Sequence, residues 1–431
     1  MTRALASLLV AAALAGMVVL VAREPASPGY PRAFSYSHLR STGAPFVTGN
    51  VVDTAAVKFQ ARFDQTIIDP ARVGIGAEAL RLMRSYNKRA TMLAFHKAGK
   101  FFVCGVGWYG QTPPVYGCDT TGQNAAWSRW KVIRKHDAVV LGVRGGMYAG
   151  NGGGWLDFGR PGFAAEYADT IVAWSGQPFG GAFLDETCLT TWWARTATDT
   201  ADYRRHGYAT YAEWDRDYRA GMLAFYDRMD ARLGLVVGNC GPTGALAANG
   251  WMGENLPYQP PASWDGWHAV LDRADTAYAP PQMSFITAMR EGLPWASLEC
   301  QRRVRFILGT ASLHDAVSGT LVGSSFDPLR GFQPDYWPDE LCVTAKGNAS
   351  VDMRRKGWLG QPKGPAILGG IWRRDFDHGV VLVNPSRAPV TLEPGANLYR
   401  IRGKACPSVN TGEPVWAITV PANDGIFLQR R

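Results

Sequence analysis

Several motifs are missing from this 431-residue sequence, and each absence argues against a class of protein. None of the seven cysteines forms a Cys-x-x-Cys pair, which argues against a zinc site built from closely spaced thiolates. No Gly-x-Ser-x-Gly elbow occurs, so a serine hydrolase of the α/β type has little support. The sequence also lacks a Lys/Arg block and an RNA-binding aromatic motif, so we expect no nucleic-acid partner.

Charged residues are sparse. They form 19% of the chain against 46% hydrophobic residues, so we expect a folded chain with a full core and room for an appended domain. The 45 basic residues exceed the 36 acidic ones and give a net charge of +9, but the excess is dispersed. Such a dispersed excess favours an anionic glycan or a cell surface over nucleic acid, and it names no substrate by itself.

The longest apolar run stands at the start of the sequence. Arg3 precedes the uncharged run Ala4 to Ala22, which predicts a secretory signal peptide or an N-terminal membrane anchor over residues 1–22. Cleavage after Ala15 or after Ala22 stays open. We therefore expect a secreted or periplasmic protein, attached to the membrane through this segment if the segment is retained.

Seven cysteines in an exported protein predict up to three disulfides and one remaining thiol. Cys104 and Cys118 flank a loop rich in Gly and Pro, so they are one candidate pair. Cys188 and Cys240 each follow a predicted strand and form a second candidate pair if those strands are neighbours. The alternative is that each cysteine is a small buried hydrophobe.

Strand-like and helix-like segments alternate along most of the chain, which predicts an α/β fold with a parallel sheet. We assign residues 23–60 to a linker and N-terminal extension, and residues 61–363 to a (β/α)8 TIM barrel with a long insertion at about 105–154. The eight predicted strands are Thr66 to Ile68, Thr91 to Phe95, Gly154 to Phe158, a strand from Gly181, Leu235 to Gly238, Gly250 to Gly253, Met283 to Ala288 and His314 to Gly319.

The pattern changes after Gly364, where short apolar runs alternate with turn signals and helical periodicity is weak. Asp377-His378-Gly379 is a good tight-turn signal, and Val380 to Val383 has the composition of a buried strand. Residues 364–431 are therefore predicted to form a small β domain.

Two acidic side chains end predicted barrel strands. In Gly181-Ala-Phe-Leu-Asp-Glu186 a short apolar run delivers Asp185 to the C-terminal end of a strand, where active sites of such barrels form. Glu254 follows the sixth predicted strand, with Asn239 after the strand between. Hydrolysis of a glycosidic bond needs two carboxyl groups, so Asp185 and Glu254 are the predicted catalytic pair. The alternative is that these acids cap helices or pair with loop arginines.

Other polar and aromatic residues are predicted to contact the substrate. Asp157 and Asp69 also end strands, and Glu186 points away from Asp185 if its strand continues. Flat rings can stack on sugars, which favours a carbohydrate substrate. The predicted substrate-binding residues are Asp157, Asn239, Glu186, His96, Trp251, Tyr258 and Asp69. For His96 a structural role is the alternative, and for the tryptophans a place in the core. We predict no metal and no cofactor, and the oligomeric state stays open.

The order of these motifs resembles a known group of proteins. The motifs are Trp155-Leu-Asp-Phe-Gly159, Gly181-Ala-Phe-Leu-Asp-Glu186, Val237-Gly-Asn239, Gly253-Glu-Asn255 and Trp372-Arg-Arg-Asp-Phe-Asp-His-Gly-Val-Val-Leu-Val-Asn-Pro385. From about Arg62 onward the chain resembles glycoside hydrolases of (β/α)8 type. It is most similar to the hypothetical glycosyl hydrolase family 15 and more distantly to endo-α-1,4-polygalactosaminidases. The resemblance implies a barrel with a C-terminal β-sandwich, an acid after the fourth strand and a second acid on a later strand.

The resulting hypothesis is an exported glycoside hydrolase that cleaves a polysaccharide or oligosaccharide. Asp185 is the predicted nucleophile and Glu254 the predicted general acid/base of a retaining mechanism. An inverting mechanism is one alternative. A non-catalytic glycan-binding protein on the same barrel is the other.

Overall fold

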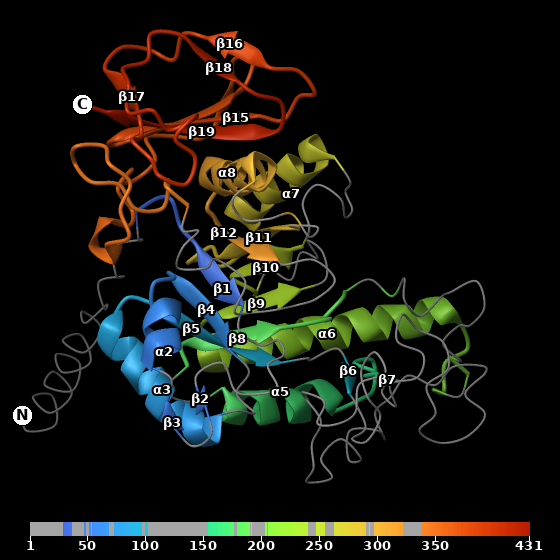
Figure 1. Cartoon of the computed structure of the whole chain (residues 1–431). Coiled ribbons are helices and arrows are strands. Elements are labelled where there is room, and N and C mark those ends of the chain that lie inside the picture. Colours follow the sequence, from blue (N-terminus) through green and yellow to red (C-terminus); the bar gives the residue numbers. More distant parts are fainter. Residues whose placement is uncertain are drawn as a thin grey trace, which may run out of the picture.

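The fold comes from a computed structural model, shown in Figure 1. The structure describes residues 29–36, 47–48, 51–52, 54–68, 73–96, 100–101, 154–175, 179–189, 191, 203–204, 206–239, 247–254, 263–289, 293, 297–321 and 338–431. One sheet of eight parallel strands has the order β1-β4-β5-β8-β9-β10-β11-β12. Its strands are β1 (Phe34–Tyr36), β4 (Gln65–Ile68), β5 (Thr91–His96), β8 (Gly181–Leu184), β9 (Val236–Asn239), β10 (Gly250–Gly253), β11 (Ser284–Met289) and β12 (Ala316–Leu321).

The first and last strands of this sheet meet, and so the sheet closes into a barrel. Ala33, just before β1, forms a parallel bridge with Ser318 on β12. The Ser318 amide donates to the carbonyl oxygen of Arg32 over 3.2 Å. The predicted TIM barrel is therefore confirmed.

Two details of the strand prediction were wrong. The barrel includes β1, which pairs with β4 from Phe34↔Gln65 to Tyr36↔Ile67, although we had assigned this stretch to the N-terminal extension. The predicted third strand is not a barrel strand, because β7 (Gly154–Trp155) pairs antiparallel with β6 (Lys100–Phe101) in a separate ribbon. A second ribbon joins β2 (Val47–Thr48) to β3 (Val51–Val52).

Alternate residues of the barrel strands point into the ring, as the two-residue period of a strand requires. The interior holds a cluster of Phe34, Ile67, Leu93, Phe183, Val237, Met252, Met283, Phe285 and Val317. Residues of the opposite phase pack against the surrounding helices: Met92 and Ala94, for example, belong to a cluster with Leu80 and Met83. This phase decides which side chains reach the mouth of the barrel.

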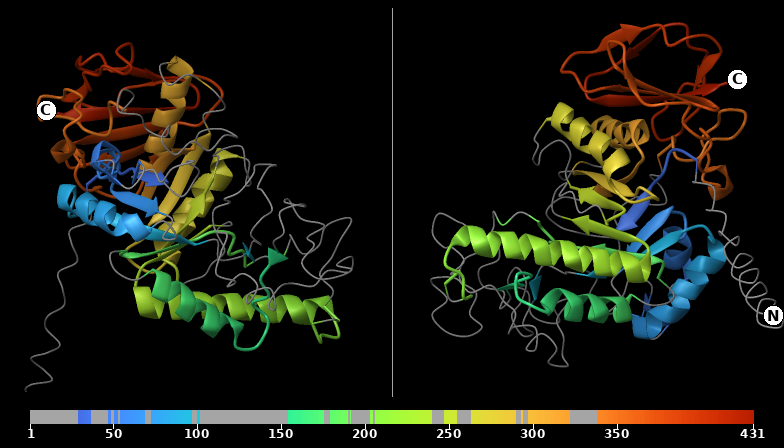
Figure 2. Two further views of the ribbon diagram at one scale, coloured as in Figure 1. Left: turned by 60° about the horizontal axis from the view of Figure 1, so that its bottom comes forward. Right: turned by 180° about the vertical axis from the view of Figure 1, so that it is seen from behind.

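The helices cover the outside of the barrel (Figure 1). They are α2 (Thr54–Gln60), α3 (Val73–Tyr86), α5 (Phe163–Trp174), α6 (Tyr211–Leu233), α7 (Trp264–Ala277) and α8 (Leu298–Leu313). Helix α6 begins with a capping box between Thr210 and Glu213 and ends at Gly234, whose φ of 67° suits glycine. Figure 2 shows α5 and α6 side by side, where Phe158 and Tyr167 contact Phe225.

The C-terminal part forms a β domain with two sheets, as predicted (Figure 1). Short 3-10 helix η6 (Met353–Arg355) precedes it. Its five-stranded sheet has the order β13-β14-β15-β19-β17, and β16 pairs with β18. The strands are β13 (Ile367–Leu368), β14 (Trp372–Phe376), β15 (Gly379–Asn384), β16 (Val390–Leu392), β17 (Leu398–Arg400), β18 (Ile418–Val420) and β19 (Asp424–Arg430). A buried ion pair between Arg305 on α8 and Asp424 on β19, 2.7 Å long, ties this domain to the barrel.

The cysteine pairings stay predictions. Cys104, Cys118 and Cys240 lie outside the described residues, whereas Cys188 is fully buried after β8. Cys342 and Cys406 are also buried, and neither forms a disulfide. Five of the seven cysteines then remain, so the chain can form at most two disulfides and the predicted number of three was wrong. Within the described ranges, no helix has both the length and the apolar character that crossing a membrane requires.

Candidate active site

The inward phase of three neighbouring strands brings Asp185, Asn239 and Glu254 to one end of the barrel. Each stands two residues after an inward-facing apolar residue, namely Phe183 on β8, Val237 on β9 and Met252 on β10. Because strand side chains alternate, a residue two positions on keeps the inward direction. All three polar groups lie at the C-terminal ends of their strands, where barrel enzymes place their active sites.

The amide of Asn239 joins the two acids. Its Nδ2 donates to Asp185 Oδ1 over 2.9 Å and to Glu254 Oε1 over 3.2 Å. The two oxygens are therefore no more than about 6.1 Å apart, the sum of 2.9 and 3.2 Å. An amide nitrogen carries two hydrogens, so one Asn can serve both carboxylates. The predicted acid pair thus meets in one group, with Asn239 between its members.

A backbone hydrogen bond holds Asp185, which is less exposed than Asn239 and Glu254. The Asp185 amide donates to the carbonyl oxygen of His96 over 2.8 Å, and the residue is 8% exposed. Asn239 and Glu254 are half-buried. The strand ends at Leu184, so Glu186 lies in a turn, with a φ of 59° in the left-handed region. Backbone conformations of this kind recur at functional sites in proteins. Contact of Glu186 with a substrate stays a prediction.

His96 was wrongly predicted as a substrate-binding residue. Its phase on β5 is outward, like that of Met92 and Ala94, and Nε2 lies 2.7 Å from Ser175 Oγ after α5. Burial lowers the pKa of His96 to about 3 because the charged ring has no access to water. His96 is therefore a neutral structural histidine between the barrel and a helix.

Asp157 was also predicted to bind substrate, and the structure gives it a different role. Its side chain is fully buried, with Oδ2 2.7 Å from His206 Nδ1. Oδ1 accepts from the amide of Gly159 over 3.1 Å and from Trp214 Nε1 over 3.2 Å. Through these contacts, Asp157 connects the segment after β7 to helix α6. The prediction failed because β7 does not belong to the barrel sheet.

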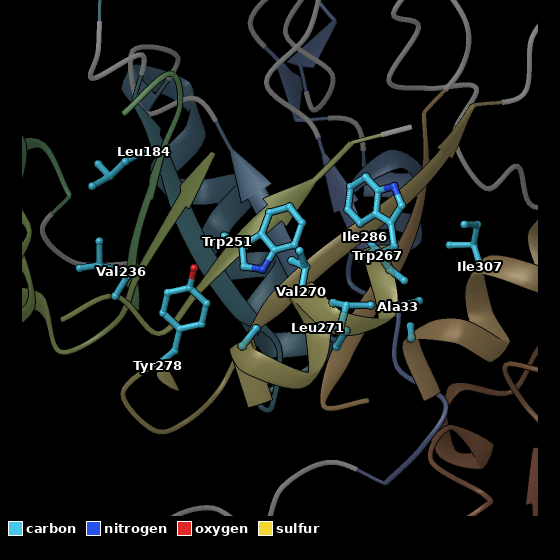
Figure 3. Close-up of a cluster of buried hydrophobic side chains, with 14 of the residues drawn as sticks. Ala33, Leu184, Val236, Trp251, Trp267, Val270, Leu271, Tyr278, Ile286 and Ile307 are labelled. Carbon is cyan, nitrogen blue, oxygen red and sulfur yellow. The ribbon is translucent and has the colours of Figure 1, made fainter. Parts of the chain in front are cut away.

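Trp251 lies in the core and was wrongly predicted to contact substrate (Figure 3). It precedes the inward-facing Met252, so its ring points outward and is 3% exposed. There it stacks on Trp267 of α7, with ring centroids 5.4 Å apart and planes at 17°. Trp264 of α7 is likewise buried. These rings hold α7 against the barrel.

Two inward-facing residues were missed by the sequence analysis. Thr287 on β11 is fully buried two residues after Phe285, and the pairing Gly253↔Ile286 places it beside Glu254. Phe95 on β5 is half-buried and stacks on Phe183, with centroids 6.0 Å apart. The alternation of strand residues was the signal that would have found both. Asp69 and Tyr258 lie outside the described residues, and their predicted contacts stay untested.

Comparisons with known proteins give the fold a context. No family model matches the chain, and no curated protein matches its sequence. The structure is similar to a maltogenic alpha-amylase, AmyB, from Thermotoga neapolitana, with a TM-score of 0.52 and 9% identity over 93% of this chain and 97% of that chain. The glycoside hydrolase domain of PelA from Pseudomonas aeruginosa matches with a TM-score of 0.41 and 15% identity over 68% of this chain and 94% of that chain. The structural neighbours are thus glycoside hydrolases, and the amylase likeness shows the fold, which by itself does not define a reaction.

Proposed function

We propose that this protein is a glycoside hydrolase that uses Asp185 and Glu254 as its catalytic pair. The observation that carries the proposal is the shared donor: one Asn239 amide contacts both carboxylates at the C-terminal end of the barrel. Many folds of this kind host unrelated reactions, so the proposal depends on the site and not on the barrel. A carbohydrate is the substrate class that two converging carboxyl groups serve best.

The spacing of the acids favours retention of configuration. The two N–H bonds of an amide diverge, so acceptors aligned with both lie about 5 Å apart. Retaining glycosidases separate their carboxyl groups by about 5 to 5.5 Å and inverting ones by about 6.5 to 9.5 Å. The two oxygens that accept from Asn239 are at most about 6.1 Å apart, from 2.9 and 3.2 Å, which places the acids nearer to the retaining separation than to most of the inverting range.

The roles follow from the surroundings of each acid. Asp185 is held by its backbone and is the nucleophile: its carboxylate bonds to the anomeric carbon as the glycosidic bond breaks. Glu254 gives its proton to the departing oxygen. It then takes a proton from water, which attacks the anomeric carbon and releases Asp185. Asn239 holds both side chains together at the mouth of the barrel.

Two finer assignments rest on the sequence. The motif order supports membership of a group like the hypothetical glycosyl hydrolase family 15, and the uncharged run Ala4 to Ala22 supports export. N-terminal sequencing of protein recovered from the culture medium and from the membrane tests the second assignment. A start after Ala15 or Ala22 in the soluble fraction supports cleavage, and an intact Met1 in the membrane supports an anchor.

The function is tested by exposing the protein to a panel of uronate, hexosamine and neutral polysaccharides. Binding and the release of reducing ends are measured on the same panel. We expect at least one glycan that is bound and cut, with loss of cutting in Asp185→Asn and in Glu254→Gln. Binding without new reducing ends on any glycan would instead support the glycan-binding alternative. Proton NMR of the first product then reports whether the anomeric configuration is retained.

A further inference from the structure

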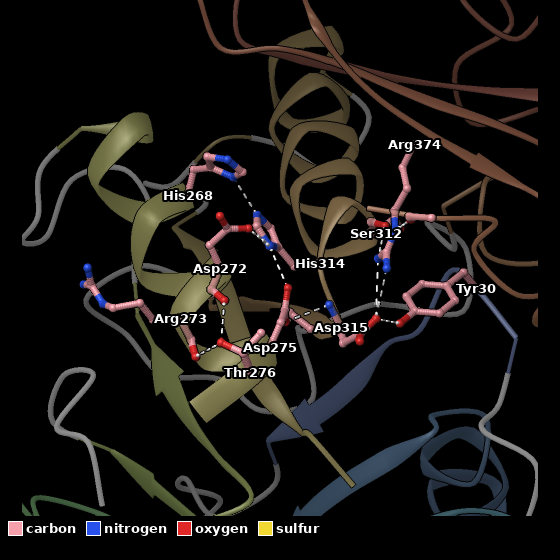
Figure 4. Close-up of polar contacts among 12 residues, drawn as sticks. Tyr30, His268, Asp272, Arg273, Asp275, Thr276, Ser312, His314, Asp315 and Arg374 are labelled. Atoms are coloured by element: carbon pink, nitrogen blue, oxygen red, sulfur yellow. Dashed lines mark hydrogen bonds and ion pairs between the residues drawn. The ribbon is translucent and has the colours of Figure 1, made fainter. Parts of the chain in front are cut away.

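A second group of polar side chains lies between helix α7 and the turn that joins α8 to β12 (Figure 4). His268 and Asp272 stand one turn apart on α7, so both project from the same face of the helix. His314 stands in the turn between α8 and β12. One ligating atom from each of the three residues lies within 4.8 Å of the others. Two imidazoles and a carboxylate so placed are a common ligand set for transition metals.

Hydrogen bonds orient the ring of His314. Its Nδ1 lies 2.9 Å from Asp275 Oδ2, and an ionised carboxylate only accepts, so Nδ1 carries the hydrogen. The other ring nitrogen, Nε2, faces His268 Nδ1, 2.8 Å away, and in neutral His314 this nitrogen carries the lone pair. Asp275 is itself held, because its Oδ1 accepts from the Asp315 amide over 3.0 Å. A histidine oriented by a carboxylate behind it is the usual arrangement at a protein metal site.

Packing holds the His268 ring in place. It stacks on Trp264, with centroids 5.1 Å apart and planes at 10°, and contacts Trp372 of the C-terminal domain, with centroids 3.9 Å apart. His314 is buried, with its side chain 1% exposed, whereas the side chain of Asp272 is 69% exposed. The cluster therefore has two packed imidazole rings on the protein side and an exposed carboxylate toward solvent.

We propose that His268, Asp272 and His314 form a site for a divalent transition metal ion, of which Zn²⁺ fits best. Neutral imidazole suits zinc, whereas calcium and magnesium prefer oxygen ligands. Zn–N bonds are about 2.0 to 2.1 Å long, so the two ring nitrogens need to separate only slightly from their hydrogen-bonded distance to hold the ion. The hydrogen between them has to leave, so metal binding places the hydrogen of neutral His268 on its other ring nitrogen, Nε2. Rotation of Asp272 supplies the third ligand, and water takes the fourth position.

This site is separate from the proposed catalytic pair. His314 precedes β12, at the N-terminal ends of the barrel strands, whereas Asp185 and Glu254 follow the C-terminal ends of theirs. The ion would link α7, the turn before β12 and, through Trp372, the C-terminal domain. Its role is structural: it stabilises the contact between barrel and β domain, because an ion bound only by the folded state raises stability.

The test is calorimetric titration of the metal-stripped full chain with ZnCl₂, paired with thermal unfolding at each zinc concentration. We expect one saturable equivalent and a rise in Tm. His268→Gln should abolish both, and Asp275→Asn should weaken binding by about 10- to 100-fold while leaving the three ligands present. His378→Ala, an exposed histidine of the β domain, and Asp227→Asn, an exposed acid of α6, are the matched controls and should bind as the wild type does.

Replacing Zn²⁺ with Co²⁺ gives a second readout, since a tetrahedral cobalt site has strong visible absorption, which His268→Gln should remove. Failure of the wild type to bind one equivalent, or unchanged binding in His268→Gln with a native fold, would overturn the proposal. Glycan hydrolysis does not enter either measurement.

Discussion

Asn239 donates a hydrogen bond from Nδ2 to Asp185 Oδ1 over 2.9 Å, across the boundary between β9 and β8. The same nitrogen reaches Glu254 on the far side, over 3.2 Å. A single neutral side chain thus sets the separation of two acids that are far apart in sequence. The proposed catalytic role of the two acids and the proposed positioning role of Asn239 both depend on these two hydrogen bonds.

Changing Asn239 should damage the reaction more than the fold. Asn239→Ala removes the donor that both carboxylates share, and misplacement of catalytic groups by about 1 Å can cost up to about 100-fold in rate, so we expect kcat to fall by roughly 10- to 100-fold. Asn239→Asp puts a third acid between the other two and should reduce kcat further at neutral pH. Steady-state kinetics on the responsive glycan, with urea unfolding of each variant, measure both effects. Equal kcat values in all three proteins would contradict the positioning role.

Asp157→Asn separates the structural role of this acid from its predicted sugar contact. The asparagine oxygen can still accept from Gly159 and Trp214, but the buried pair with His206 is lost. Loss of a partner for a buried polar group typically costs about 1 to 3 kcal/mol, and we expect a loss of that size in urea unfolding. KM should stay unchanged. A raised KM at wild-type stability would restore the sugar-binding assignment.

Because His96 is buried, we expect the free energy of unfolding to depend on pH in a specific way. Burial lowers the pKa of His96 to about 3 from the usual value of about 6.5, so the unfolded chain binds the proton more readily. The stability that comes from the neutral ring is complete above about pH 6.5 and is lost as the pH falls toward 3, by at most about 1.4 kcal/mol per pH unit.

Urea unfolding between pH 4 and pH 7 measures this slope. In His96→Gln, which keeps a polar partner for Ser175, the slope should be smaller than in the wild type. The exposed His378→Gln is the control and should leave the slope unchanged. Identical slopes in the wild type and His96→Gln would show that His96 titrates normally.

Trp251 is expected to matter for stability and not for glycan affinity. Trp251→Ala removes a ring that is 3% exposed and stacked on Trp267, and such changes cost about 3 to 5 kcal/mol. Trp416→Ala, at a tryptophan that is 77% exposed, should change the free energy of unfolding by less than about 0.5 kcal/mol. Chemical denaturation compares the two. Near-equal stabilities would argue that Trp251 is not part of the core.

The sequence predicted the barrel and its acid pair because both are local patterns. The apolar runs before Asp185 and Glu254 are short strands with polar ends, and the two-residue period fixes their direction. The same period predicts the direction of Trp251. This residue precedes the inward-facing Met252, so its side chain must face outward. Applied strand by strand, it would also have found Thr287.

The errors arose where pairing between distant segments decides the structure. Strand β1 is three residues long beside a Pro/Ser-rich stretch. Only its pairing with Gln65 to Ile67 and the bridge from the preceding Ala33 to β12 make it part of the barrel. Gly154–Trp155 has strand composition but pairs with Lys100–Phe101 outside the ring. Asp157 follows it and therefore meets His206 in the core. Propensity cannot distinguish these cases, because the partner strand is not encoded locally.

The most direct test of the catalytic pair is mass spectrometry of Glu254→Gln during reaction with the responsive sugar carrying an activated leaving group. With the acid/base removed, the first step should still proceed and the second should stall. We predict a glycosyl adduct on the peptide that contains Asp185, absent in Asp185→Asn/Glu254→Gln. An adduct on another residue, or wild-type turnover by Glu254→Gln, would contradict the account.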